Sequence, residues 1–277
     1  MAEARGPAVR LRNAELTFGT RTLWAGLDLD VEPGEFVAVL GPNGSGKTSL
    51  LKVLLGLQRL TAGTVEVVGH SPRRGSSLVG YVPQQRGFDR DLPLRGRDLV
   101  ALGLDGHRWG VPWPSASRRR RVEAAVAEVG ATLFADHPVG RLSGGEQQRL
   151  RMAQALLGDP AVLLFDEPLL SLDLQHQRAI TDLVDRSRRG REAAVLFVTH
   201  EVNPVLPLVD RVLYLVEGRW AAGRPEDVLT SERLSSLYET DVDVLKVRGR
   251  LVVVGAPDSP HLGGDSHHHP DDAATRR

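Results

Sequence analysis

The chain contains no cysteine among its 277 residues. Disulfide bonds, cysteine nucleophiles and cysteine-ligated zinc sites are therefore excluded, and a reducing cytosol suits such a composition. The chain also lacks an apolar run near the length of about 18 residues that a membrane-spanning helix needs. Its opening residues, MAEARGPAVR, contain no apolar core for a signal peptide. If the function involves a membrane, we expect another chain to supply the part that spans it.

A net charge of one sign is absent too, because 35 lysine and arginine residues balance 35 aspartate and glutamate residues. This balance argues against a protein whose main task is to bind nucleic acid or anionic lipid. The run Arg118–Arg121 could contact lipid headgroups or nucleic acid, but such a run is more often a solvated helix face. With 41% hydrophobic and 25% charged residues, the chain is typical of a soluble globular protein.

Strand-like and helix-like segments alternate through most of the chain. Residues 36–41, FVAVLG, are continuously apolar, as in a strand buried on both faces. Apolar residues then recur at helical spacing from Gly46 to Gln58. The segments AVLLFDE and AAVLFVTH read as further buried strands on either side of a helix around residues 174–188. This alternation predicts an α/β fold with a largely parallel core sheet.

Three other stretches depart from that alternation. Residues 86–141 show little strand pattern and predict a mostly helical insertion, with one helix over 118–130. Two hairpins are expected near the C-terminal end, with turns at Glu217-Gly218 and Arg248-Gly249. Residues 255–277 are rich in proline, glycine, aspartate and histidine, which predicts disorder.

The same tail carries four of the nine histidines. With nearby aspartates they could bind Zn²⁺ or Mn²⁺ loosely, although a disordered polar tail is the favoured interpretation. The residues concerned are His261, His267, His268, His269, Asp265, Asp271 and Asp272.

The segment GPNGSGKT, residues 41–48, fits the phosphate-loop pattern and lies between a buried strand and a helix, as that motif requires. Glycines allow the backbone N–H groups to point inward at phosphate oxygens, and the helix N-terminus adds favourable charge. Lys47 could then reach the β- and γ-phosphates, while Thr48 could offer its hydroxyl to Mg²⁺. The predicted nucleotide contacts here are Gly41, Pro42, Asn43, Gly44, Ser45, Gly46, Lys47, Thr48 and Ser49.

Two acids close the apolar strand VLLFDEP, residues 162–168. Carboxylates at the end of a buried strand are costly unless they hold something charged, and Mg²⁺ bound to a nucleotide meets that need. Asp166 would coordinate the ion, and Glu167 would orient or deprotonate the water that attacks the γ-phosphate. Alone, the pair would more often be a helix cap, but the phosphate loop favours the catalytic interpretation.

A second glycine-rich helix start occurs at LSGGEQQR, residues 142–149. Ser143 and Glu146 have the spacing of a capping box. A capping box leaves the two consecutive glycines unexplained, because each costs about 1 kcal/mol inside a helix. They suit a helix start that a large anion approaches closely.

The order GPNGSGKT, VPQ, LSGGEQQR, LLFDEP, SLD and VTH resembles the nucleotide-binding subunit of ATP-binding cassette (ABC) transporters over about residues 8–240. The resemblance implies a P-loop NTPase (RecA-like) core with an antiparallel β subdomain and an inserted helical subdomain. We expect the nucleotide-binding domain at residues 1–245, with its helical subdomain at about 86–150. A remnant hairpin and the histidine-rich tail would occupy 246–277.

The resemblance also implies roles for single residues. Phe18 corresponds to an aromatic that stacks on adenine, although a buried core phenylalanine is an equally good interpretation. Gln84 corresponds to a glutamine that senses Mg²⁺ and the membrane partner. His200 corresponds to a histidine that contacts the γ-phosphate. Ser143, Gly144 and Gly145 would contact the γ-phosphate of a second, head-to-tail ATPase subunit. Asp173 corresponds to a loop that joins the two active sites across the dimer.

By resemblance, the chain would be an ATPase that binds ATP and Mg²⁺ at the cytoplasmic face of the membrane. Its partners would be an identical ATPase subunit, membrane permease subunits and an extracellular substrate-binding protein. The region around YVPQ, and the segment from residue 210 to 255, are similar to ATPases of manganese, zinc or iron importers. An importer of iron chelates, haem or vitamin B12, an exporter, and a soluble ABC protein acting on ribosomes or DNA are the alternatives. No nucleic-acid partner is expected.

Overall fold

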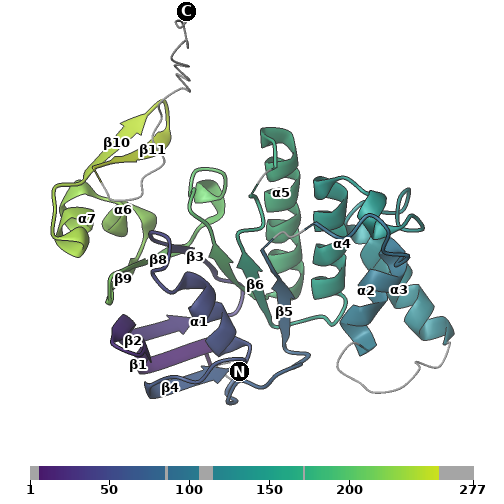
Figure 1. The fold of residues 1–277 in the computed structure, drawn as a ribbon, viewed down its shortest axis with the longest axis horizontal. Helices are drawn as coiled ribbons and strands as arrows, with labels where there is room; N and C mark the ends of the chain where they lie inside the picture. Colours follow the sequence, from purple (N-terminus) through teal and green to yellow (C-terminus); the bar gives the residue numbers. More distant parts are fainter. Residues whose placement is uncertain (1–5, 85–86, 106–114, 171, 256–277) are drawn as a thin grey trace, which may run out of the picture.

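The structure is a computed structural model that describes residues 6–84, 87–105, 115–170 and 172–255 (Figure 1). Its centre is a six-stranded sheet in the order β5-β6-β7-β3-β8-β9. All neighbouring strands in it run parallel except β8 and β9. The strands are β3 (Phe36–Leu40), β5 (Val79–Val82), β6 (Val162–Asp166), β7 (Ala194–Val198), β8 (Arg211–Val216) and β9 (Arg219–Gly223).

Both faces of the central sheet are covered. Successive residues of β6 point to opposite sides, so Leu163 and Phe165 pack in one core cluster while Val162 and Leu164 pack in another. Continuous apolar strands are what a parallel sheet covered on both faces requires, and the predicted α/β class is confirmed.

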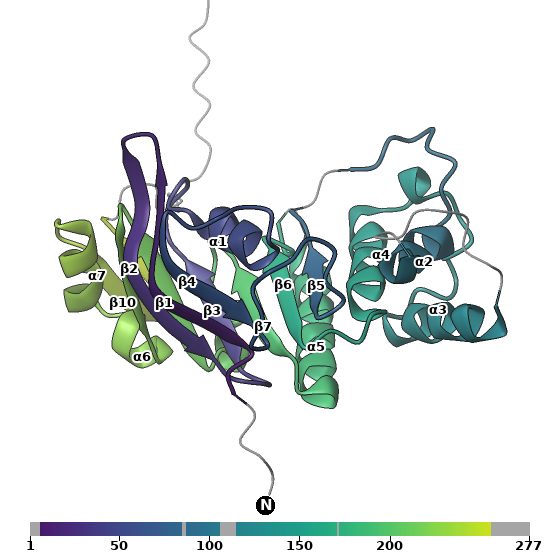
Figure 2. The ribbon, with the colours of Figure 1, turned by 90° about the horizontal axis from the view of Figure 1, so that it is seen from below.

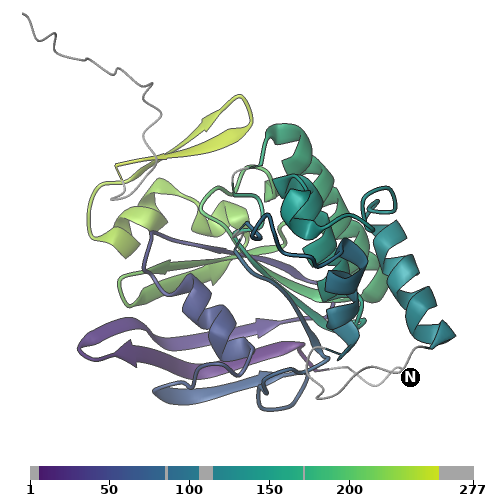
Figure 3. The same cartoon turned by 45° about the vertical axis from the view of Figure 1, so that its right-hand side comes forward.

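A second, antiparallel sheet of three strands has the order β2-β1-β4. Its strands are β1 (Val9–Phe18), β2 (Arg21–Val31) and β4 (Ala62–Val67). Helix α1 (Lys47–Leu54) lies between this sheet and the central sheet (Figure 3), where Leu50 and Leu51 are fully buried. These contacts fix the first turn of α1, which begins at the end of the phosphate loop.

Helix α1 ends earlier than its apolar spacing predicts. The helical spacing of apolar residues extends to Gln58, but the helix stops at Leu54. Gly56 adopts a left-handed φ of 67°, and a Cβ there would lie 2.9 Å from the backbone of Arg73. The chain therefore turns at Gly56 against a neighbouring segment, and a helical pattern in the following residues cannot continue the helix.

A group of helices lies beyond β5 at one end of the central sheet (Figure 2). It contains α2 (Gly96–Asp105), α3 (Ala116–Glu128) and α4 (Gly144–Leu156). Helix α5 (Leu174–Arg191) shares a core cluster with this group and with the sheet residues Phe165 and Phe197. The helical group thus packs on α5 and carries the start of α4.

Ion pairs join α3 to the end of α5. Arg191 donates two hydrogen bonds to the carboxylate of Glu128 at 2.8 and 2.7 Å. Its Nε donates to Asp159, in the loop after α4, at 3.0 Å. Ser187 also donates to Glu128 at 3.2 Å. Arg191 lowers the pKa of Glu128 below its ordinary value, chiefly through this side-chain hydrogen bond.

The last described segment forms α6 (Pro225–Val228), α7 (Ser231–Tyr238) and the hairpin of β10 (Asp243–Val247) and β11 (Arg250–Val254). Both predicted hairpins are confirmed, with Gly218 and Gly249 at positive φ in their turns. The β10–β11 hairpin begins at Asp243, so it includes residues on both sides of the expected boundary at 245. The histidine-rich tail from residue 256 lies outside the described residues. Among the described helices, none is long and apolar enough to cross a membrane.

Candidate functional site

Several of the predicted site residues follow the carboxyl ends of parallel strands. The phosphate loop follows β3, Glu167 follows β6 and His200 follows β7. Gln84 follows β5 and is exposed. Because these strands are parallel neighbours, their carboxyl ends meet at one edge of the sheet, where open α/β sheets place their ligands.

The phosphate loop is shaped by glycines at positive φ. Gly41, Gly44 and Gly46 have φ of 137°, 77° and 97°. At Gly41, a Cβ would lie 2.1 Å from the carbonyl oxygen of Leu215 in β8. At Gly46, which caps α1, a Cβ would lie 2.9 Å from the indole nitrogen of Trp24. Side chains at Gly41 and Gly46 would clash with Leu215 and Trp24 and displace the loop, so the glycines of this pattern have a steric cause.

Polar groups inside the loop suit an anion. The Lys47 ammonium donates to the carbonyl oxygens of Gly41 and Pro42 at 2.7 and 2.8 Å, so its charge lies within the curl of the loop. Burial lowers the pKa of Lys47, opposed by Glu167 and Asp166. The buried Ser45 hydroxyl has no hydrogen-bond partner within the described part of the chain. A phosphate group would provide acceptors for both side chains.

Thr48 and Asp166 form the next part of the site. The Thr48 hydroxyl donates to Asp166 Oδ1 at 3.0 Å, and the Tyr81 hydroxyl donates to Oδ2 at 3.4 Å. Asp166 is 3% exposed, and this burial raises its pKa against the lowering effect of the Thr48 hydrogen bond. Burial, together with Asp166, raises the pKa of Tyr81 to about 12.

This hydroxyl and carboxylate fit a magnesium ion. Mg²⁺ prefers hard oxygen ligands, keeps several waters and is usually held by one or two protein groups plus substrate phosphates. Within the described residues no three His, Cys, Asp or Glu side chains gather to hold a metal ion unaided. Thr48 and Asp166 would hold such an ion together with the phosphates of a nucleotide.

Glu167 and His200 face each other across the ends of β6 and β7. His200 Nδ1 lies 3.5 Å from Glu167 Oε2, and both side chains line a cavity of about 70 Å³. Glu167 has a left-handed φ of 48°, while its backbone N–H donates to the carbonyl of Val198 in β7 at 3.0 Å. Such a backbone is strained for a residue with a side chain, and strain of this kind gathers at functional sites.

Phe18 is not part of the core. It lies at the end of β1 and is 51% exposed. Its cross-strand partner is Arg21, whose guanidinium donates to the carbonyl of Gly44 in the phosphate loop at 3.1 Å. The interpretation of Phe18 as a buried structural residue was wrong, because its side chain is exposed. No sequence pattern identified Arg21.

The second glycine-rich helix start has the expected cap. The Ser143 hydroxyl accepts the Glu146 N–H at 3.4 Å, and the Glu146 carboxylate accepts the Ser143 N–H at 2.8 Å. The predicted capping box is confirmed. Gly145 is buried in the first turn of α4, against His176 of α5. Asp173 caps α5 by accepting the backbone N–H of His176 at 2.9 Å. The preceding Ser171 lies outside the described residues.

One chain brings together only part of the predicted site. The phosphate loop, Asp166, Glu167 and His200 meet at the sheet edge. Within the described ranges, no hydrogen bond or ion pair links Ser143, Gly145 or Asp173 to that group. These residues form a second cluster at the N-terminal ends of α4 and α5.

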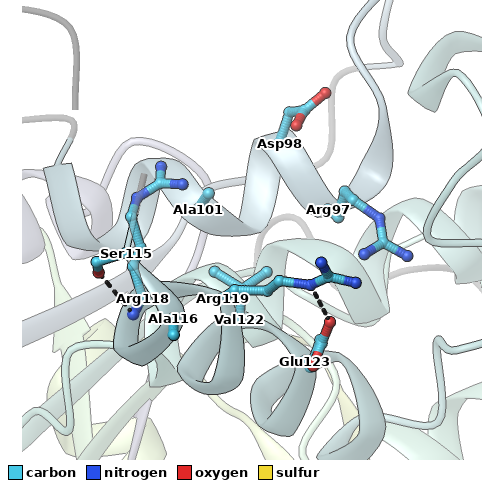
Figure 4. Close-up of a pocket in the computed structure, with 9 residues that line it drawn as sticks. All are labelled: Arg97, Asp98, Ala101, Ser115, Ala116, Arg118, Arg119, Val122 and Glu123. Carbon is cyan, nitrogen blue, oxygen red and sulfur yellow. Dashed lines mark hydrogen bonds and ion pairs between the residues drawn. The ribbon is translucent and has the colours of Figure 1, made fainter. Parts of the chain in front are cut away.

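A cavity larger than the one beside Glu167 and His200 lies elsewhere. It has a volume of about 570 Å³ and lies between α2 and α3, where Arg97, Asp98 and Arg118 line it with Arg119 and Glu123 (Figure 4). None of the predicted nucleotide-contacting residues lines this cavity.

The phosphate loop at the end of a buried strand, the Thr48–Asp166 pair and the Glu167–His200 pair define the class of protein: a P-loop nucleoside triphosphatase. The sequence profile described as ABC transporter matches residues 24–170.

Curated relatives match nearly the whole chain. The manganese transport system ATP-binding protein MntB of Halalkalibacterium halodurans is 31% identical over 90% of this chain and 98% of its own length. The zinc import ATP-binding protein ZnuC of Halorhodospira halophila is 35% identical over 85% of this chain and 84% of its own.

Among solved structures, an inward-facing transporter assigned to the metal-chelate type of ABC transporter matches with a TM-score of 0.75 and 26% identity. That match covers 89% of this chain and 96% of the other. The chain belongs to the ABC transporter family, and it is an ATP-binding subunit with ATPase activity.

Proposed function

We infer that this chain hydrolyses ATP to power the import of a divalent metal ion of the manganese or zinc type. The observation that carries this proposal is the alignment of nearly the whole chain with ATP-binding subunits of manganese and zinc systems. The site geometry supplies the chemistry: a phosphate loop, a hydroxyl–carboxylate pair and a strained glutamate beside a histidine.

In this proposal the phosphate loop holds ATP. The inward backbone N–H groups, Ser45 and the Lys47 ammonium bind the β- and γ-phosphates, while Phe18 stacks on adenine. Thr48 and Asp166 hold Mg²⁺, and Gln84 joins them from the end of β5. The ion would neutralise charge that develops on the phosphate oxygens.

Hydrolysis needs a base close to the γ-phosphate. Glu167 has only 15% of its side chain exposed, and its left-handed backbone directs the carboxylate to the sheet edge beside His200. In this proposal Glu167 accepts the proton of the attacking water, and His200 contacts the γ-phosphate and orients the glutamate.

The second cluster acts on another subunit. In the part of the chain that the structure describes, no hydrogen bond or ion pair joins Ser143, Gly144, Gly145 or Asp173 to the phosphate loop. We therefore assign them to the ATP of an identical, head-to-tail partner, as the family resemblance implies. The capped start of α4 presents N–H groups and a favourable dipole to that partner's γ-phosphate.

The membrane partners complete the transporter. Permease subunits would bind this chain at the cytoplasmic face near Gln84 and the helical group, and an extracellular protein would deliver the metal. The likeness to a metal-chelate type transporter favours a second candidate, in which the cargo is a chelated metal rather than a free ion.

Uptake by cells lacking this chain tests the proposal. Cells complemented with the wild type or with Glu167→Gln would be given radioactive manganese, radioactive zinc or a radioactive ferric chelate. The proposal expects the wild type, and not the variant, to restore uptake of manganese or zinc. If only uptake of the chelate is restored, the cargo is the chelated metal and not the free ion. Normal uptake of all three without the chain would contradict an import role.

A further inference from the structure

His176 connects two segments that are separate in sequence. It lies in the first turn of α5, and its ring Nδ1 is 2.9 and 2.8 Å from the two carboxylate oxygens of Asp173. The same carboxylate also accepts the His176 backbone N–H. These contacts hold the pKa of Asp173 below its ordinary value, the backbone hydrogen bond contributing most. An ionised carboxylate only accepts hydrogen bonds, so Nδ1 must carry the hydrogen.

The other side of the ring lies on Gly145. A Cβ at Gly145 would be 2.7 Å from His176 Cδ2 and 3.3 Å from Nε2. Contacts under 3.0 Å require something to move, and the ring is held by Asp173. The first turn of α4 therefore approaches α5 closely only because residue 145 has no side chain. This gives the second glycine of LSGGEQQR a steric reason that the sequence alone did not show.

We propose that His176 is a positioning residue that holds the start of α4 and the Asp173 loop together as one unit, so that both meet the partner's ATP in a fixed arrangement. The proposal rests on the proposed function, which assigns Ser143, Gly145 and Asp173 to the nucleotide of a partner subunit. Two segments that are ordered before association lose less conformational entropy when the subunits close.

The effect of His176 is confined to association. Among the residues that the structure describes, no hydrogen bond or ion pair links its side chain to the phosphate loop. The side chain is 45% exposed, so its loss leaves no large cavity. Removing it should weaken closure of the dimer without changing how one subunit binds ATP. A role in folding alone would instead lower thermal stability.

The test uses the full chain carrying Glu167→Gln, which should trap ATP-bound dimers. Dimer dissociation constants would be measured by sedimentation velocity for this parent and for the parent with His176→Ala, His176→Asn or His70→Ala. His70 is an exposed histidine in the turn after β4 and serves as the control. Binding of a fluorescent ATP analogue and the melting temperature would be measured on each.

His176→Ala should raise the dimer dissociation constant at least about tenfold, the scale of one hydrogen bond to a charged group. Nucleotide affinity and melting temperature should not change. His176→Asn, which keeps a donor for Asp173, should recover most of the loss, and His70→Ala should match the parent. If the parent dimerises and the parent with His176→Ala dimerises equally well, the positioning role of His176 is wrong, while the proposed function stands. A parent that binds ATP but stays monomeric contradicts the proposed function, and the role of His176 falls with it.

A second pair of variants tests the contact with Gly145. In the same parent, Gly145→Ala forces a methyl group against the ring and should weaken dimerisation. Adding His176→Ala removes the ring and should return part of that loss. If the double variant is as weak as the sum of the two single losses, Gly145 and His176 act independently and the proposal is wrong.

Discussion

The Thr48 hydroxyl donates a hydrogen bond to Asp166 Oδ1 at 3.0 Å, although the two residues are 118 positions apart in the chain. Thr48 lies in the first turn of α1 and Asp166 is the last residue of β6, so the packing of this helix and this strand brings a hydroxyl and a carboxylate together. Both oxygens are ligands of the kind that Mg²⁺ prefers.

Thr48→Val should therefore weaken the use of Mg²⁺. The Mg²⁺ concentration that gives half-maximal ATPase activity should rise by about 10- to 100-fold, the scale on which a lost supporting group weakens a metal site. Thr48→Ser keeps the hydroxyl and serves as the control. An unchanged Mg²⁺ dependence in Thr48→Val, measured by phosphate release, would contradict this role.

His200→Ala should slow hydrolysis while leaving ATP binding intact. His200 lies 3.5 Å from Glu167 at the sheet edge and is partly exposed, so its removal should disturb the reacting phosphate more than the fold. We expect kcat to fall by about 100- to 1,000-fold, as for loss of one charge-stabilising donor, with little change in KM. A KM effect without a kcat effect would assign His200 to binding alone.

Phe18→Ala should weaken nucleotide binding. Stacking of a base on an aromatic ring contributes about 1–3 kcal/mol. The Phe18 side chain is exposed, and its cross-strand partner Arg21 donates a hydrogen bond to Gly44 of the phosphate loop. The dissociation constant of a fluorescent ATP analogue should rise accordingly, while Phe18→Tyr should bind like the wild type. Equal affinities for all three proteins would show that Phe18 does not contribute to nucleotide binding.

The local motifs were predictable because their steric demands fall on consecutive residues. Gly41, Gly44 and Gly46 take positive φ, and Ser143 and Glu146 cap each other, within single turns of chain. The alternating strands and helices likewise predicted the central sheet, because both faces of β3 and β6 are buried.

What the sequence did not show depends on packing between distant segments. Three features arise only when the folded chain brings two elements together. They are the contact of the His176 ring with Gly145, the left-handed backbone of Glu167 and the hydrogen bond from Arg21 to Gly44. The early end of α1 at Leu54 has the same cause, since Gly56 turns against Arg73.

The Glu128–Arg191 ion pair should make stability depend on acid. The pKa of Glu128 is lowered in the folded protein from its ordinary value of 4.5, so its contribution is complete above that pH and is lost as the pH falls through the lowered pKa. Glu128→Gln should be less stable than the wild type at neutral pH, and the difference should shrink in acid. Urea unfolding at several pH values would show this convergence, and a constant difference would contradict it.

We assign one ATP to the phosphate loop of one chain and to the start of α4 of another chain. Sedimentation velocity of Glu167→Gln tests this assignment most directly. With ATP and Mg²⁺ bound, hydrolysis should stop, with kcat lower by about 100- to 10,000-fold, and the protein should sediment as a dimer. Without nucleotide it should sediment as a monomer. A variant that binds ATP yet hydrolyses it at the wild-type rate, or stays monomeric, would contradict the account.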